Sequence, residues 1–106
     1  MTTRLRNEIK CGIRGIEVEH ELVMKLHSEK AEEYLTYAIN NIIKDILNSN
    51  GFSNFTVQSA TTNSVEFFKI IIYFDNGFET MSPTCSFDYV GRTKLVNWLV
   101  NYLKED

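Results

Sequence analysis

The sequence predicts an α+β fold, in which two helices cover one face of an antiparallel sheet of four to six strands. Three observations predict it: paired segments of alternating hydrophobicity, an Asn-Gly turn signal at 76–77, and helical spacing of apolar residues in 31–47 and 92–103. Hairpins with separate helices are typical of an antiparallel sheet, not of parallel strand–helix units. The expected order is β-β-α-β-β-β-β-α in a single domain, 1–106, with residues 1–7 frayed.

The first two expected strands form an N-terminal hairpin. Apolar residues or His occupy every second position of one segment: Ile16, Val18, His20, Leu22, Met24 and Leu26. A two-residue turn at 14–15 would pair this segment with the strand around Ile9 and Ile13 and would place Lys10 opposite Glu19. The alternation therefore predicts two strands between residues 8 and 27.

The same alternation would align three acidic residues on one face. Glu17, Glu19 and Glu21 would share the polar face of the second strand. A row of like charges on one face can dock a basic protein through electrostatic complementarity. Alternatively, the row is an ordinary solvated face that pairs with the cations of the first strand.

The helix over residues 31–47 is expected between a Ser28 N-cap and a Gly51 C-cap. Its apolar arc is roughly 220° wide and that of the C-terminal helix about 200°, whereas one sheet contact needs only about 100°. Tyr37 and Trp98 lie at the edges of these arcs. Tyr37 and Trp98 are therefore candidates for contact with a partner.

The strand over residues 65–74 is apolar on both faces. One face carries Val65, Phe67, Ile71 and Tyr73, and the other carries Phe68, Ile70, Ile72 and Phe74. An antiparallel sheet usually has one solvent-exposed face. The face with Phe68, Ile70, Ile72 and Phe74 is therefore predicted to be an apolar surface that a partner or a second copy covers. The alternative is that the N-terminal hairpin covers it within the monomer.

Composition excludes several classes of protein. The chain has 106 residues and a net charge of −3, and no apolar run reaches the roughly 18 residues of a membrane helix. No signal peptide is recognisable, and the two cysteines, Cys11 and Cys85, are fewer than a disulfide framework requires. We expect a cytoplasmic protein. The many Asn, Ile and Lys residues suggest a phage or mobile element, in which case the location is the host cytoplasm.

No motif predicts catalysis, a metal or a cofactor. His20 and His27 would point to opposite faces of a regular strand, and the glycines are too scattered for a phosphate loop. Cys11 and His20 would be diagonal neighbours in the hairpin, but a thiol among apolar residues is unreactive. We therefore expect a protein that is not an enzyme.

These observations favour a non-catalytic accessory factor that binds another protein and forms a homodimer, of the inhibitor, immunity or phage-encoded antagonist type. One alternative is a nucleic-acid-binding regulator that uses Arg4, Arg6, Lys10 and Arg14 with aromatic loop tips. The excess of acids over bases makes nucleic acid the weaker candidate. A further alternative is a small enzyme whose site assembles across a dimer interface.

Overall fold

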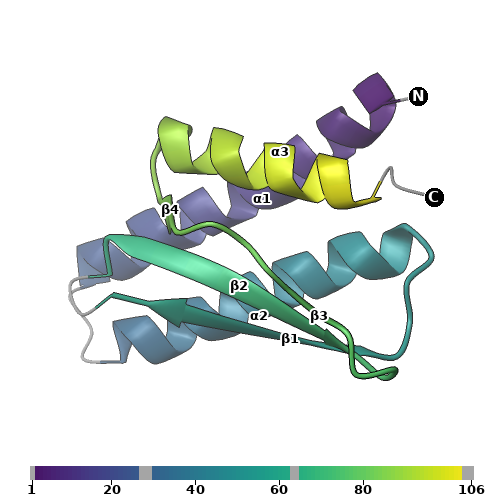
Figure 1. The fold of residues 1–106 in the computed structure, drawn as a ribbon. Coiled ribbons are helices and arrows are strands. Elements are labelled where there is room, and N and C mark those ends of the chain that lie inside the picture. The colour runs from purple at the N-terminus through teal and green to yellow at the C-terminus, as the bar shows by residue number, and fades with distance from the viewer. Residues whose placement is uncertain (1, 27–29, 63–64, 104–106) are drawn as a thin grey trace.

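The computed structural model describes residues 2–26, 30–62 and 65–103 and confirms the α+β class. It contains three helices and an antiparallel sheet of four strands (Figure 1). In chain order the elements are α1 (Thr2–Leu26), α2 (Ala31–Ser49), β1 (Phe55–Thr61), β2 (Phe67–Phe74), β3 (Glu79–Met81), β4 (Cys85–Ser86) and α3 (Tyr89–Leu103). The expected N-cap Ser28, together with His27, lies outside the described residues.

The predicted N-terminal hairpin is wrong, because this segment forms helix α1. A helical period runs through the same residues, since Ile9, Ile13, Ile16, His20 and Val23 recur every three or four positions. All of them are buried except His20, which is half-buried. Three other positions that the strand pattern assigned to the core are instead exposed: Val18 is 55% exposed, Leu22 48% and Met24 42%. Residues 2–7, expected to be frayed, form the first turns of α1.

Two glycines let α1 approach α2 closely. A Cβ atom at Gly12 would lie 2.9 Å from Cδ1 of Ile46, and one at Gly15 would lie 3.2 Å from Cδ1 of Ile42. In the expected hairpin these glycines belonged to a turn or a bulge. In the structure they provide the space into which side chains of α2 pack.

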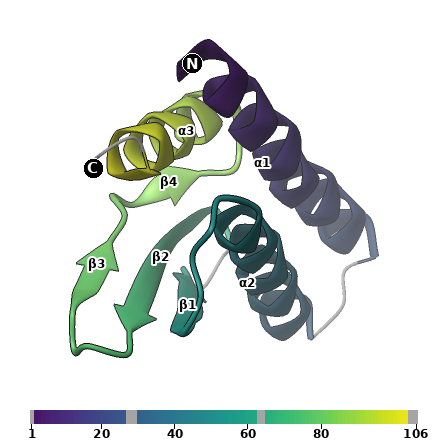
Figure 2. The ribbon, with the colours of Figure 1, turned by 90° about the vertical axis from the view of Figure 1, so that its right-hand side faces the viewer.

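The remaining helices agree better with the sequence. Helix α2 ends at Ser49, and Gly51 follows it with φ +89°, as the expected left-handed cap requires. Helix α3 begins earlier than residue 92, at Tyr89. Helix α2 packs against β1 and α3 against β4, while α1 packs against both other helices. Figure 2 shows this helical part of the molecule beside the sheet.

Strand β2 is the centre of the sheet. It pairs with β1 on one side and with both β3 and β4 on the other (Figure 2). The Ser82-Pro83 segment separates β3 from β4, and Ser82 keeps this segment attached to β2 through two hydrogen bonds. The Ser82 N–H donates to the Ile70 carbonyl at 2.8 Å, and the Ile70 N–H donates to Ser82 Oγ at 2.9 Å. The two short strands are therefore segments of one interrupted edge.

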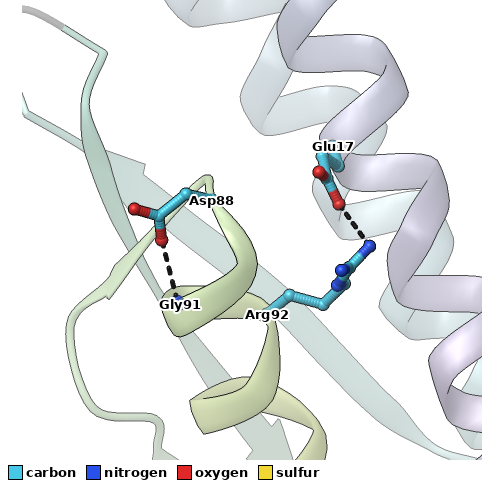
Figure 3. A network of polar contacts seen from close by, with 4 residues as sticks. All are labelled: Glu17, Asp88, Gly91 and Arg92. Carbon is cyan, nitrogen blue, oxygen red and sulfur yellow. Dashed lines mark hydrogen bonds and ion pairs between the residues drawn. The ribbon is translucent and has the colours of Figure 1, made fainter.

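The start of α3 is fixed by a side-chain cap (Figure 3). The Gly91 N–H donates to Oδ1 of Asp88 at 3.1 Å, and the Ser86 hydroxyl donates to the same oxygen. These two hydrogen bonds hold the pKa of Asp88 below its ordinary value, the Ser86 contact being the larger cause. Nearby, Arg92 of α3 pairs with Glu17 of α1 at 2.6 Å.

Asp88→Asn should destabilise the protein in a pH-dependent way. Because folding lowers the pKa of Asp88, its charge stabilises the folded state above the unfolded-state pKa, and this contribution is lost as the pH falls through the folded-state pKa. Urea midpoints measured against pH should converge for the wild type and the variant under acidic conditions. Ser86→Ala should shift the Asp88 transition to higher pH. Parallel stability curves for wild type and Asp88→Asn would contradict this role.

Candidate protein-binding surfaces

The apolar face predicted as an interface is the inner face of the sheet. Phe68 is 3% exposed, Ile70 and Ile72 are fully buried, and Phe74 is partly buried against the same core. The expectation that these side chains form an open surface is therefore wrong. Their cover comes from this chain, as the alternative interpretation required, although it consists of helices and not of a hairpin.

The other face of β2 is the one that remains open. Phe67 is 42% exposed, Tyr73 is 37% exposed and Ile71 is half-buried. Met81 of β3 pairs with Ile71 and is 52% exposed. We call these four residues and Lys69 the outer sheet face.

One signal in the sequence distinguishes the two faces. Lys69 points to the same side as Phe67, Ile71 and Tyr73, because it is separated from each by an even number of residues. The opposite set, from Phe68 to Phe74, contains no charge. A lysine in the middle of a strand indicates the solvent-exposed face of that strand. The sequence interpretation did not use this signal.

The expected acidic row is not a row in the structure. Residues two positions apart on a helix point roughly 200° apart. Glu17 pairs with Arg92 of α3, whereas Glu19 accepts a hydrogen bond of 2.9 Å from the Tyr34 hydroxyl of α2. This contact raises the pKa of Tyr34 through the hydrogen bond and the nearby charge. Of the three, only Glu21 is exposed, and the prediction that they share one acidic face is wrong.

The two arc-edge aromatics have different environments. Tyr37 is 68% exposed and lines a groove of about 560 Å³ with Leu22 and Tyr34 at the junction of α1 and α2. Trp98 is partly buried and stacks on Tyr102, with 6.4 Å between the ring centroids. Tyr37 is thus available to a partner, whereas Trp98 belongs to the packing of α3.

His20 and Cys85, two of the groups with potential chemistry, are held in structural contacts. His20 donates through Nε2 to the Val65 carbonyl at 2.9 Å and stacks on Phe87, with ring centroids 4.1 Å apart. Val65 has φ +57°, which is rare for a β-branched residue. Cys85 is buried, and burial raises the pKa of its thiol. Cys11 is exposed on α1.

Among the described residues, no group of three or more His, Cys, Asp or Glu side chains could hold a metal ion. Within residues 2–26, 30–62 and 65–103, no helix is long and apolar enough to cross a membrane.

The basic residues of the nucleic-acid alternative all lie on α1, where Arg6, Lys10 and Arg14 recur every four positions and therefore share one face. Arg4 pairs with Glu8 at 3.4 Å, and Arg6 donates to Asn97 Oδ1 of α3 at 2.7 Å. Of the aromatic residues expected at loop tips, which are Phe52, Phe55 and Phe78, the first two pack against the core and Phe78 is exposed.

Comparison of this chain with protein-family models, curated proteins and solved structures finds no match.

Proposed function

We propose that the protein is a non-catalytic accessory factor that binds another protein through the outer sheet face. The observation that carries this proposal is the central strand, which leaves Phe67, Ile71 and Tyr73 open on the side opposite the helices. A contiguous apolar patch with polar surroundings is typical of a protein-binding surface. Aromatic residues and methionine are also enriched in such surfaces.

The chemistry of this face favours an amphipathic helix of the partner. An antiparallel sheet buries an apolar face most simply against a helix with one apolar stripe. Lys69 and Glu79 both lie on this side of the sheet, toward opposite ends of β2, and neither makes an ion pair within the described part of the chain. The partner helix should therefore carry an acidic residue near Lys69 and a basic residue near Glu79.

The groups with potential chemistry support a binding role. His20 and Cys85 are engaged in packing and hydrogen bonds, and Cys11 is exposed on the surface of α1. In the described residues, no cysteine has a histidine among its hydrogen-bond partners. The inhibitor, immunity and antagonist types are all compatible with an exposed apolar face on a small domain.

The test is a pair of identical substitutions on opposite sides of the molecule. The full chain is used as bait with Tyr73→Ser, which changes the outer sheet face, and Tyr37→Ser, which changes the helical side. Any protein that the wild type retains is purified, and its affinity for each variant is measured by calorimetry. Tyr73→Ser should weaken binding at least about tenfold, because buried tyrosines at an interface contribute strongly. Tyr37→Ser should bind like the wild type.

Equal binding by the wild type and Tyr73→Ser would overturn the proposal. A loss of binding in Tyr37→Ser but not in Tyr73→Ser would also overturn the proposal, because the groove between α1 and α2 would then be the interface. Both variants must show the circular dichroism of the wild type.

A further inference from the structure

The charges of helix α1 are segregated along its length. Residues 2–15 carry four cations and one acid, whereas residues 16–26 carry three acids and one cation. The acid of the first part, Glu8, pairs with a neighbouring cation of the same helix, Arg4. The other three cations are Arg6, Lys10 and Arg14. Positive charge is therefore concentrated in one part of a chain whose net charge is −3.

The stability of the helix does not account for this arrangement. The unpaired amide groups at the N-terminus of a helix make that end partly positive, so acids stabilise the first turn and cations oppose it. Helix α1 has no acid in its first turn and carries Arg4 there instead. The partial charge of the helix end and the charges of the side chains therefore add, and the potential at this end of α1 is positive.

Three of the cations form a row along α1, and we call Arg6, Lys10 and Arg14 the basic stripe. Successive members are four residues apart, which corresponds to about 6 Å along the helix. Lys10 and Arg14 are exposed, and neither makes an ion pair or a side-chain hydrogen bond within the described part of the chain. Arg6 donates through Nη1 to Asn97, which leaves its other N–H groups available.

Helix α3 places neutral polar side chains beside the basic stripe. It packs against α1 (Figure 2), and Asn97 is the residue that contacts Arg6. Thr93 lies one turn before Asn97 on the same side of α3, and both residues are exposed. The first acid beyond the stripe, Glu17, is paired with Arg92 at 2.6 Å. The charge of Glu17 is therefore compensated, and the stripe keeps its positive potential.

We propose that the basic stripe binds the phosphate backbone of double-stranded DNA without reading its bases. A row of cations with constant spacing fits a polymer whose charges also repeat at a constant spacing, as phosphates do. Thr93 and Asn97 are of the residue types that contact phosphate oxygens beside arginine and lysine. Helix α1 contains no Phe, Tyr or Trp, so the stripe lacks the stacking platform that is typical of single-strand binding.

This inference does not depend on the proposed function. The basic stripe lies on the helical side of the molecule, whereas the outer sheet face lies on the side opposite the helices (Figure 2). A protein partner and a DNA duplex would therefore occupy different surfaces. Tyr73→Ser, which tests the outer sheet face, should bind DNA like the wild type.

Fluorescence anisotropy of two labelled DNA duplexes of unrelated sequence, titrated with the full chain at several salt concentrations, tests the proposal. Both duplexes should bind with equal affinity. The logarithm of the association constant should fall against the logarithm of the salt concentration with a slope of about −2 to −3, because the stripe neutralises about three phosphates. Lys10→Gln should reduce the steepness of this slope by about 1 and weaken binding about fivefold at about 0.1 M salt.

Lys44→Gln is the matched control. It removes the same charge from an exposed lysine of α2, a helix that contributes nothing to the basic stripe. This variant should bind both duplexes like the wild type. Unlabelled poly-glutamate is the second control, and it should displace the labelled DNA far less well than unlabelled duplex does.

Three results would overturn the proposal. The first is a wild type that binds neither duplex at the lowest salt concentration. The second is equal weakening by Lys10→Gln and Lys44→Gln, because net charge and not the stripe would then determine binding. The third is poly-glutamate that competes as well as duplex DNA, because the stripe would then fit an acidic protein. Circular dichroism of both variants must match that of the wild type.

Discussion

Gly91→Ala should destabilise the protein by about 4 kcal/mol, at the upper end of what single substitutions cause. A Cβ atom at this position would lie 1.7 Å from the carbonyl oxygen of Ser86 and 2.5 Å from its nitrogen. The obstacle is backbone, so no side-chain rotation can relieve it. The substitution would force apart the first turn of α3 and strand β4, whose contact also positions the Asp88 cap. Urea denaturation followed by circular dichroism measures the loss.

Gly77→Ala provides the comparison for this effect. Gly77 has φ +87° in the turn before β3, and nothing lies within 4 Å of the position a Cβ would occupy. The cost there is conformational strain alone, about 1 kcal/mol. Equal losses for the two variants would mean that β4 and α3 are not as close as the structure places them.

Ile70→Asp should prevent folding or reduce the free energy of unfolding by about 4 kcal/mol or more. Ile70 is fully buried on the inner face of β2, where a carboxylate has no compensating charge. The midpoint of thermal or urea unfolding gives the loss, and collapse of near-ultraviolet dichroism would report a disrupted core.

Ile71→Asp is the matched control, because it makes the same change at the neighbouring residue on the opposite face of β2. Ile71 lies on the outer sheet face, so the same carboxylate remains hydrated, and the loss should stay within about 1 kcal/mol. If Ile71→Asp unfolds the protein while Ile70→Asp is tolerated, the assignment of the two faces of β2 is reversed.

The sequence predicted the elements from α2 onward because each signal there has a single interpretation. Helical spacing over residues 31–47 has no competing alternation, and Gly51 terminates α2 through a backbone angle that other residues rarely adopt. The turn before β3 was equally clear, since Gly77 supplies a positive φ and the Asn76 side chain accepts from the Phe78 N–H.

The N-terminal segment failed because two periods coexist in it. Isoleucines three and four apart define a helix face, while Val18, Leu22 and Met24 complete a false alternation. The competing signal was the pair of glycines, Gly12 and Gly15, which we interpreted as turn or bulge residues. Their space is needed by Ile46 and Ile42 of α2, a tertiary contact that no local pattern reveals.

The candidate surface was predictable in kind but not in position. The two-sided hydrophobicity of β2 predicted an apolar surface besides the face that the helices cover, and the structure leaves Phe67 and Tyr73 exposed on the other face. Which side is covered depends on where three helices pack, and we had expected two.

Amide hydrogen exchange along β1 tests most directly the strand register that separates the outer sheet face from the core face. We expect the N–H groups of Thr56, Gln58 and Ala60 to be protected, because they face β2. Those of Phe55, Val57, Ser59 and Thr61 should exchange faster, because they point away from β2. The reverse alternation would contradict the register and with it the assignment of the two faces of the sheet.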